Sequence, residues 1–293
     1  MKHTAIWLTC LFLMVATGIA FWILFPDDGL FGERGRIGVI EIRGTIENAQ
    51  ENLKALKEYR KDTRIKAILL RIDSPGGGIG PSQELYREVK RTTEAKPVVA
   101  SLGGIAASGG YYVAAATNRI IANPGTITGS IGVIMFFPNL KELLDKIGIY
   151  SNIIKSGRFK DVGNPGREMT LEERDLMQGT IEEAHRQFVQ DVAMGRSLPE
   201  EEVRQIADGR IIMGQTALKL GLIDELGNFE DAVNIAAKLG KIEGDPELLF
   251  ARKKRFSLLD LLFGSEVSEK VKSCLDGDSL FLRYQLPASR DLL

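Results

Sequence analysis

The chain of 293 residues balances 38 lysines and arginines against 39 aspartates and glutamates, for a formal net charge of −1. This balance gives no reason to expect nucleic acid or another polyanion as a partner. A hydrophobic fraction of 44% with 26% charged residues describes an ordinary globular body. The two cysteines, Cys10 and Cys274, exclude a disulfide-stapled scaffold, because Cys10 lies in an apolar N-terminal segment.

That segment, residues 4–25, contains no charged residue. At about 1.5 Å per residue it is long enough to cross a hydrocarbon core of about 30 Å. A cleaved signal peptide is the alternative, with Gly18-Ile19-Ala20 as its cleavage site, but the apolar run continues beyond that site to Phe25. We therefore expect an uncleaved single-pass anchor in the cytoplasmic membrane. Lys2 favours a cytoplasmic N-terminus, which places the body on the periplasmic or extracellular side.

After a linker, residues 26–34, strand and helix patterns alternate along the chain. Alternation of this kind predicts an α/β body around a mainly parallel sheet. The predicted strands are 37–42, 66–72, 97–101, 119–122, 130–137 and 151–154, and the predicted helices are 48–59, one that begins near 81, 106–116, 139–147 and 171–192.

Ser108 lies at the centre of the small-residue run SLGGIAASGGYYVAAA, residues 101–116. It follows a strand pattern and precedes a helix pattern, so its hydroxyl would lie beside the free amides of a helix N-terminus. The surrounding residues are similar to the nucleophile elbow G-x-S-x-G, with Ala106 in place of the first glycine. Close helix packing is the alternative explanation of such a run. Ser108 is thus a candidate nucleophile for acyl transfer.

The base of such a nucleophile is not expected to be a histidine. The chain has only His3, before the anchor, and His185, which falls beside the apolar stripe of the helix predicted at 171–192 and reads as a partly exposed helix residue. Lysine is the usual substitute, and its pKa, ordinarily ~10.4, must be lowered by roughly 2 to 3 units for a neutral base near pH 8. Lys155 and Lys160 both lie in a glycine-containing loop next to an apolar strand pattern, and Asp161 would favour the charged form of Lys160 if it faced it. The residues alone do not separate the two lysines.

Two further glycine-bearing segments follow strand patterns. Residues 73–78, DSPGGG, let backbone N–H groups approach a ligand closely. No Gly-Lys-Ser/Thr follows, which argues against a phosphate loop and leaves an oxyanion hole or a tight turn. Residues 126–132, TITGSIG, read as a turn that carries hydroxyl groups.

The chain contains four short sequence motifs: DSPGGG (73–78), AASGGYY (106–112), TGSIGV (128–133) and KSGRFKD (155–161). Taken together, they resemble the signal peptide peptidase A family of membrane-anchored serine/lysine peptidases, in its short form. The resemblance covers about residues 35–235. It implies a ClpP/crotonase-like fold, a spiral of β-β-α units, for a domain at 35–240, with a C-terminal extension and tail at 241–293.

The resemblance also implies roles for five residues. Ser108 matches the nucleophile, Lys160 its general base and Ser130 the serine that orients the lysine. Gly77 and Gly109 would supply the amides of the oxyanion hole. No metal or cofactor is implied.

A membrane-anchored serine endopeptidase that degrades remnant signal peptides is the function that this resemblance implies. In the fused long form the serine and the lysine come from different repeats, so the short form is expected to assemble as a ring-shaped homo-oligomer with its sites at subunit boundaries. A crotonase-type acyl-CoA enzyme and a non-catalytic membrane assembly factor of the same fold are the alternatives. The basic-then-apolar stretch at 252–263 is expected to pack on the body or on a neighbour rather than on a bilayer.

Overall fold

The computed structural model describes residues 14, 15, 17 and 35–251 and the backbone of residues 283–285. No helix in these parts of the chain is long and apolar enough to cross a bilayer. The predicted anchor, residues 4–25, lies outside the described residues except for positions 14, 15 and 17, and it stays a prediction.

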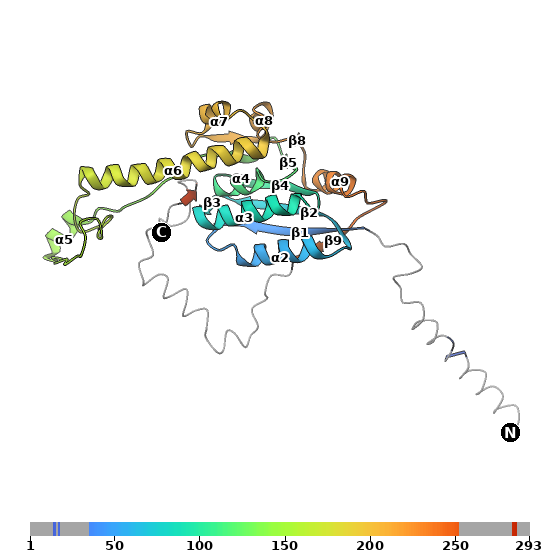
Figure 1. Ribbon diagram of the computed structural model, residues 1–293, viewed down its shortest axis with the longest axis horizontal. Coiled ribbons are helices and arrows are strands. Elements are labelled where there is room, and N and C mark those ends of the chain that lie inside the picture. Colours follow the sequence, from blue (N-terminus) through green and yellow to red (C-terminus); the bar gives the residue numbers. More distant parts are fainter. Residues whose placement is uncertain (1–13, 16, 18–34, 252–282, 286–293) are drawn as a thin grey trace, which may run out of the picture.

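A mainly parallel sheet of eight strands forms the centre of the described body (Figure 1). Its main path runs β7-β6-β4-β2-β1-β9, while β5 pairs with β4 and β8, and only the β6–β7 pair is antiparallel. A separate two-stranded ladder joins β3 and β10. The strands are β1 (Arg36–Arg43), β2 (Ile65–Ser74), β3 (Gly76–Gly78), β4 (Val98–Ala106), β5 (Arg119–Ala122), β6 (Ile127–Gly129), β7 (Ile211–Met213), β8 (Glu225–Leu226), β9 (Glu247–Phe250) and β10 (Arg283–Gln285).

Helices cover both faces of this sheet. Ile40 and Ile42 of β1 face a cluster shared with α2, α3, α4 and the second half of α6, whereas Ile37 and Val39 face α9 on the opposite side. This alternation follows from the period of two along a strand. The helices are α2 (Gln50–Lys61), α3 (Ile79–Thr93), α4 (Gly109–Ala114), α5 (Lys141–Ile147), α6 (Leu171–Arg196), α7 (Glu200–Ile206), α8 (Gly214–Lys219) and α9 (Phe229–Leu239).

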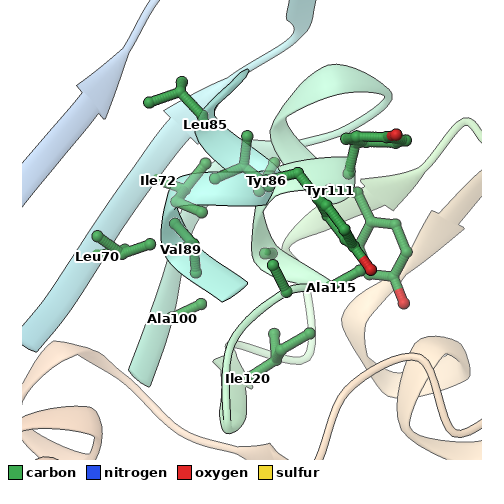
Figure 2. Packing of buried hydrophobic residues seen from close by; sticks show 14 of the residues in the cluster. Leu70, Ile72, Leu85, Tyr86, Val89, Ala100, Tyr111, Ala115 and Ile120 are labelled. Atoms are coloured by element: carbon green, nitrogen blue, oxygen red, sulfur yellow. The ribbon is translucent and has the colours of Figure 1, made fainter. Parts of the chain in front are cut away.

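The short helix α4 lies deep in the larger cluster, between the sheet and α6. Figure 2 shows Tyr86 of α3, Tyr111 of α4 and Ile72 of β2 among the buried side chains of this cluster, and the Tyr86 and Tyr112 rings lie with centroids 5.0 Å apart. The Tyr112 ring meets Phe188 of α6 edge-on with centroids 4.7 Å apart, and the Tyr111 hydroxyl donates to the Leu222 carbonyl at 2.8 Å. These contacts hold the start of α4, and with it Ser108, in a rigid setting.

The structure confirms an α/β fold with a mainly parallel sheet. β4 extends to Ala106, so α4 begins at Gly109, later than the predicted 106. The strands predicted at 130–137 and 151–154 are wrong: both segments are irregular apart from a single bridge residue. An apolar run forms a strand only where a neighbouring strand satisfies its backbone, and Ile154 is instead fully exposed.

Residues 133–181, which we call the arm, extend away from the sheet (Figure 1). The arm comprises α5, its flanking loops and the first half of α6. Its surface is unusually apolar, because many large side chains have more than two fifths of their area exposed. These exposed side chains are Ile134, Phe136, Leu140, Leu143, Ile147, Ile149, Tyr150, Ile153, Ile154, Leu171 and Leu176.

Candidate active site

Ser108 occupies the sharp turn between β4 and α4. Its backbone angles, φ 51° and ψ −120°, fall in a region that a residue with a side chain rarely adopts, at a cost on the order of 1–3 kcal/mol. Such a strained strand-to-helix turn is the geometry of a nucleophile elbow. The Ser108 Oγ is buried and has no hydrogen-bond partner among the described residues. A buried hydroxyl without a partner is rare in folded proteins and indicates a group reserved for chemistry.

The predicted oxyanion glycines lie together beside this turn. A Cβ added at Gly109 would meet the Gly77 nitrogen at 3.2 Å and the Ser82 Oγ at 2.5 Å, and one added at Gly77 would meet the Ile46 carbonyl oxygen at 2.3 Å. Both positions therefore require glycine. Gly109 is the first residue of α4, where a helix leaves its amides free. The Gly77 nitrogen thus lies close to Gly109, the residue that follows Ser108.

The direction of the Gly77 amide follows from the hydrogen bonds of its neighbours. Ile46 donates to the Gly76 carbonyl at 2.8 Å and accepts from the Gly78 amide at 2.8 Å, so Gly77 N–H points away from Ile46. On that side β10 pairs antiparallel with β3, with Tyr284 opposite Gly77. A segment of the chain itself thus takes the position that an extended peptide would need to reach this amide.

Ser130 lies next to Ser108 in space. The Ser108 amide donates to the Gly129 carbonyl at 2.8 Å, and the Thr128 hydroxyl donates to the Ala106 carbonyl at 2.7 Å. These bonds fasten the end of β6 to the elbow. Ser130 is nearly buried and, like Ser108, has φ 51°. The structure therefore brings together Ser108, Ser130, Gly77 and Gly109, four of the five predicted site residues.

The fifth, Lys160, is exposed and lies in the arm. Its loop is tied to the start of α6, since Arg158 forms an ion pair with Glu172 and Asp161 shares Arg167 with Glu173. Ser108 lies at the other end, because Phe188 of α6 packs on α4. From Glu173 to Phe188 the helix rises roughly 22 Å, about four times the reach of a lysine side chain. One chain thus does not bring Lys160 to its own Ser108.

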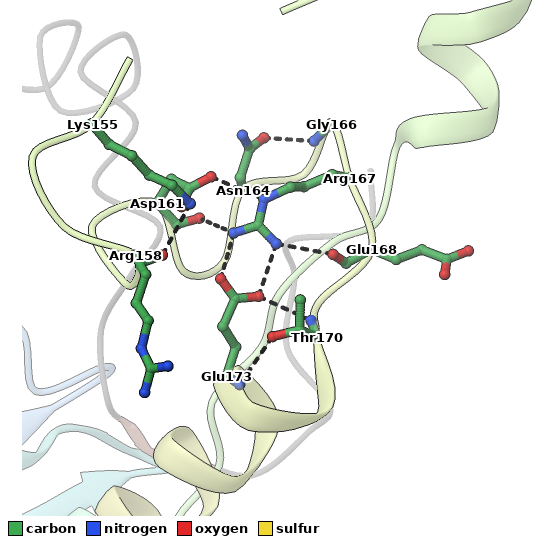
Figure 3. Close-up of polar contacts among 9 residues, drawn as sticks. All are labelled: Lys155, Arg158, Asp161, Asn164, Gly166, Arg167, Glu168, Thr170 and Glu173. Carbon is green, nitrogen blue, oxygen red and sulfur yellow. Dashed lines mark hydrogen bonds and ion pairs between the residues drawn. The ribbon is translucent and has the colours of Figure 1, made fainter. Parts of the chain in front are cut away.

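The structure does separate the two candidate lysines. Lys155 forms an ion pair with the Asp161 carboxylate and donates to the Arg158 carbonyl at 2.9 Å (Figure 3). Asp161 also accepts from the Arg167 Nε at 2.9 Å, so its carboxylate faces Lys155 and Arg167 rather than Lys160. Hydrogen bonds from Arg167 and then Lys155 hold the pKa of the Asp161 carboxyl well below its usual range. Within residues 35–251 the Lys160 side chain has no hydrogen bond or ion pair, whereas Lys155 is held in one.

His185 is partly buried on α6, as its helical position predicts, and its Nε2 has no hydrogen-bond partner among the described residues. The sequence reasoning missed Arg167 and Glu173, which organise the loop of Lys160. The sequence holds a signal for Glu173: Thr170 and Glu173 form a capping box at the start of α6, and the T-x-x-E spacing is readable without a structure. No sequence signal indicates that β10 pairs with β3.

Comparison with known proteins agrees with this geometry. Residues 90–243 match Peptidase family S49. A protein of Synechocystis sp. is 47% identical over 214 residues, which is 72% of this chain and 77% of that protein. "Serine protease SPPA, chloroplastic" of Arabidopsis thaliana is 34% identical over 264 residues, 85% of this chain and 38% of its own length. "Protease 4" of Salmonella typhi is 35% identical over 219 residues, 71% of this chain and 35% of its own length.

A strained serine elbow on a parallel α/β sheet, with two glycine amides beside the hydroxyl, defines a candidate acyl-transfer site of the serine-hydrolase kind. The match over more than half of the chain then fixes the family. The chain belongs to peptidase family S49 and is a serine protease of that family. The chain aligns with little more than a third of the length of the Arabidopsis and Salmonella relatives.

Proposed function

We propose that Ser108 is the nucleophile of an endopeptidase whose general base is Lys160. The Ser108 Oγ attacks the scissile carbonyl while the neutral Lys160 amine takes its proton, and the oxygen of the tetrahedral intermediate accepts from the Gly77 and Gly109 amides. Lys160 then protonates the leaving amine, and water hydrolyses the acyl-enzyme. Ser130 orients the lysine. The observation that carries this proposal is the strained elbow with its unpartnered, buried hydroxyl.

The lysine is supplied by a neighbouring subunit. Along α6, Glu173 at the anchored end of the Lys160 loop lies roughly 22 Å from Phe188, which packs on α4 next to Ser108, and this separation supports a site shared between chains. The arm that carries Lys160 also exposes the apolar side chains named above, and a second copy of the chain is the occupant that would cover them. A head-to-tail contact of this kind, repeated around an axis, closes into a ring with one site at each boundary.

A peptide substrate binds as an extended strand along β3, in the place that β10 occupies here. Backbone pairing with three glycines gives affinity without regard to side chains. Its register also brings a substrate carbonyl to the Gly77 amide, which faces that side. This mode of binding supports peptide hydrolysis over acyl-CoA chemistry.

The substrates that we propose are remnant signal peptides, cleaved outside the cytoplasm next to the membrane. The charge-free segment at residues 4–25 supports a membrane anchor, because it is long enough to span the hydrocarbon core. An anchored enzyme meets apolar peptides released into the bilayer at high local concentration. Extraction of membranes with carbonate and accessibility of the body to added protease in spheroplasts would test the anchor and its orientation.

The nucleophile is tested with a fluorophosphonate probe and a fluorogenic apolar peptide. We expect labelling at Ser108 and cleavage by the full chain in detergent, and neither in Ser108→Ala. Ser82→Ala is the matched control, since Ser82 lies beside Gly109 without a proposed chemical role. Equal labelling of the wild type and Ser108→Ala would refute the assignment, and labelling without any peptide cleavage would refute the peptidase.

A further inference from the structure

The arm contains a network of four charged side chains centred on Arg167 (Figure 3). Arg167 binds the Glu173 carboxylate with both terminal nitrogens, one contact being 2.8 Å, and donates to the Asp161 carboxylate through Nε at 2.9 Å. Lys155 completes the network through Asp161. Glu173 is only 3% exposed, and hydrogen bonds from Arg167 and then from the Thr170 amide lower its pKa to about 2. Bidentate pairs of this kind fix geometry more strictly than a single ion pair.

This network holds the backbone on both sides of Lys160. Arg167 donates to the Asp161 carbonyl at 3.2 Å, and Lys155 donates to the Arg158 carbonyl at 2.9 Å. The Lys160 backbone amide donates to the Gly157 carbonyl at 3.1 Å. The loop is thus tied at three points, although it lies on an exposed arm and Lys160 leaves it toward solvent.

The charges of the network are arranged so that no carboxylate is left for Lys160. Asp161, next to it in sequence, faces Lys155 and Arg167, and Glu173 faces Arg167. Glu172 pairs with Arg158. Glu168 contributes only its backbone carbonyl to Arg167, and its carboxylate points away in Figure 3. A carboxylate that turned toward Lys160 would favour its charged ammonium, the form that cannot act as a base.

We propose that Arg167 is a positioning residue of the proteolytic site, which fixes the loop of Lys160 and keeps Asp161 from pairing with that lysine. The proposal rests on the proposed function, in which Lys160 is the general base of a neighbouring subunit. Arg167 itself touches neither substrate nor nucleophile. It acts by presenting the amine of Lys160 in one place and away from the Asp161 carboxylate.

Arg167→Gln removes the clamp and leaves Asp161 held by Lys155 alone. A displacement of a catalytic group by about 1 Å can cost roughly 100-fold in rate, so we expect kcat to fall about 10- to 100-fold with KM within about threefold. The ascending limb of the pH–kcat profile, where Lys160 loses its proton, should move to higher pH by on the order of one unit. The reason is that Asp161 can then pair with Lys160 and favour its charged form. Adding Asp161→Asn in this background should return the limb toward its wild-type position, which loss of packing alone would not do.

The experiment uses the full chain in detergent, with oligomer mass, kcat, KM and pH profile measured for each variant. Arg204→Gln is the matched control, because it removes an exposed arginine–carboxylate pair on α7, outside the arm, and should leave kcat within about twofold. Arg167→Lys keeps the positive charge but lacks the guanidinium that binds Glu173 in bidentate fashion, and it replaces Arg167→Gln if that variant does not fold. For Arg167→Lys we expect a smaller loss of kcat and a pH shift in the same direction. An Arg167 variant that assembles and keeps the wild-type kcat and the wild-type position of the ascending limb would overturn the proposal. So would an ascending limb that stays shifted after Asp161→Asn is added. Full activity of Lys160→Ala would instead overturn the proposed function, so the two failures are distinguishable.

Discussion

Two inactive variants, Ser108→Ala and Lys160→Ala, should regain activity when they are assembled together. Glu173, at the anchored end of the Lys160 loop, lies roughly 22 Å along α6 from Phe188, which packs beside the elbow. In the shared site that we propose, a working site needs an intact serine from one chain and an intact lysine from the next. Under random assembly of equal amounts each condition holds for half of the chains, so about a quarter of the sites should be active, whatever the number of subunits in the ring.

The assay is co-expression with two affinity tags, purification of the mixed oligomer and cleavage of a fluorogenic peptide. Ser108→Ala mixed with Ser130→Ala is the matched control. The structure places these two serines in the same body, so every site in that mixture lacks one of them and should stay inactive. Each variant alone should show the background rate. A mixed Ser108→Ala and Lys160→Ala oligomer that remains inactive would refute the shared site and the distance argument behind it.

Four other outcomes are expected. Lys160→Ala should lower kcat by about 1,000-fold or more with the fold intact by circular dichroism, whereas Lys155→Ala should keep measurable turnover, because Lys155 is held in an ion pair; the opposite ranking would show that the base is misassigned. The pH–kcat profile should rise toward the alkaline side, as a lysine base must be deprotonated, and a maximum below pH 6 would indicate carboxylate chemistry instead. A chain that ends at residue 282 lacks β10 and should show a lower KM for peptides than one that ends at Gln285, which keeps it; equal KM values would mean that β10 does not compete with substrate. Phe188→Ala should lower the free energy of unfolding by about 3–5 kcal/mol, measured by urea denaturation, because the ring is fully buried against α4; a loss below 1 kcal/mol would contradict that packing.

Patterns in the sequence predict the α/β class, which the structure confirms, and make Ser108 the candidate nucleophile. Alternating strand and helix patterns predict a parallel sheet because each pattern is local and has its own period. The small residues around Ser108 are likewise a local requirement, that of a sharp turn from a strand into a helix. These features are readable because the restraint lies within a few residues of the position that it restrains.

The difference between the two candidate lysines is visible only in the folded chain. The choice between Lys155 and Lys160 depends on the direction in which the Asp161 carboxylate points, and Arg167, six residues further along the chain, sets that direction. The apolar segments 130–137 and 151–154 satisfy the pattern of a strand, yet in the described body neither forms one apart from a single bridge residue. The Ser130 amide donates to the Arg210 carbonyl and the Ile131 carbonyl accepts from the Gly209 amide, and both partners lie outside the strands. The separation of Lys160 from its own Ser108 is set by α6, which packs on the elbow through Phe188 and carries the lysine loop at its other end. Each of these outcomes depends on contacts between parts of the chain that are distant in sequence, and local patterns carry no information about such contacts.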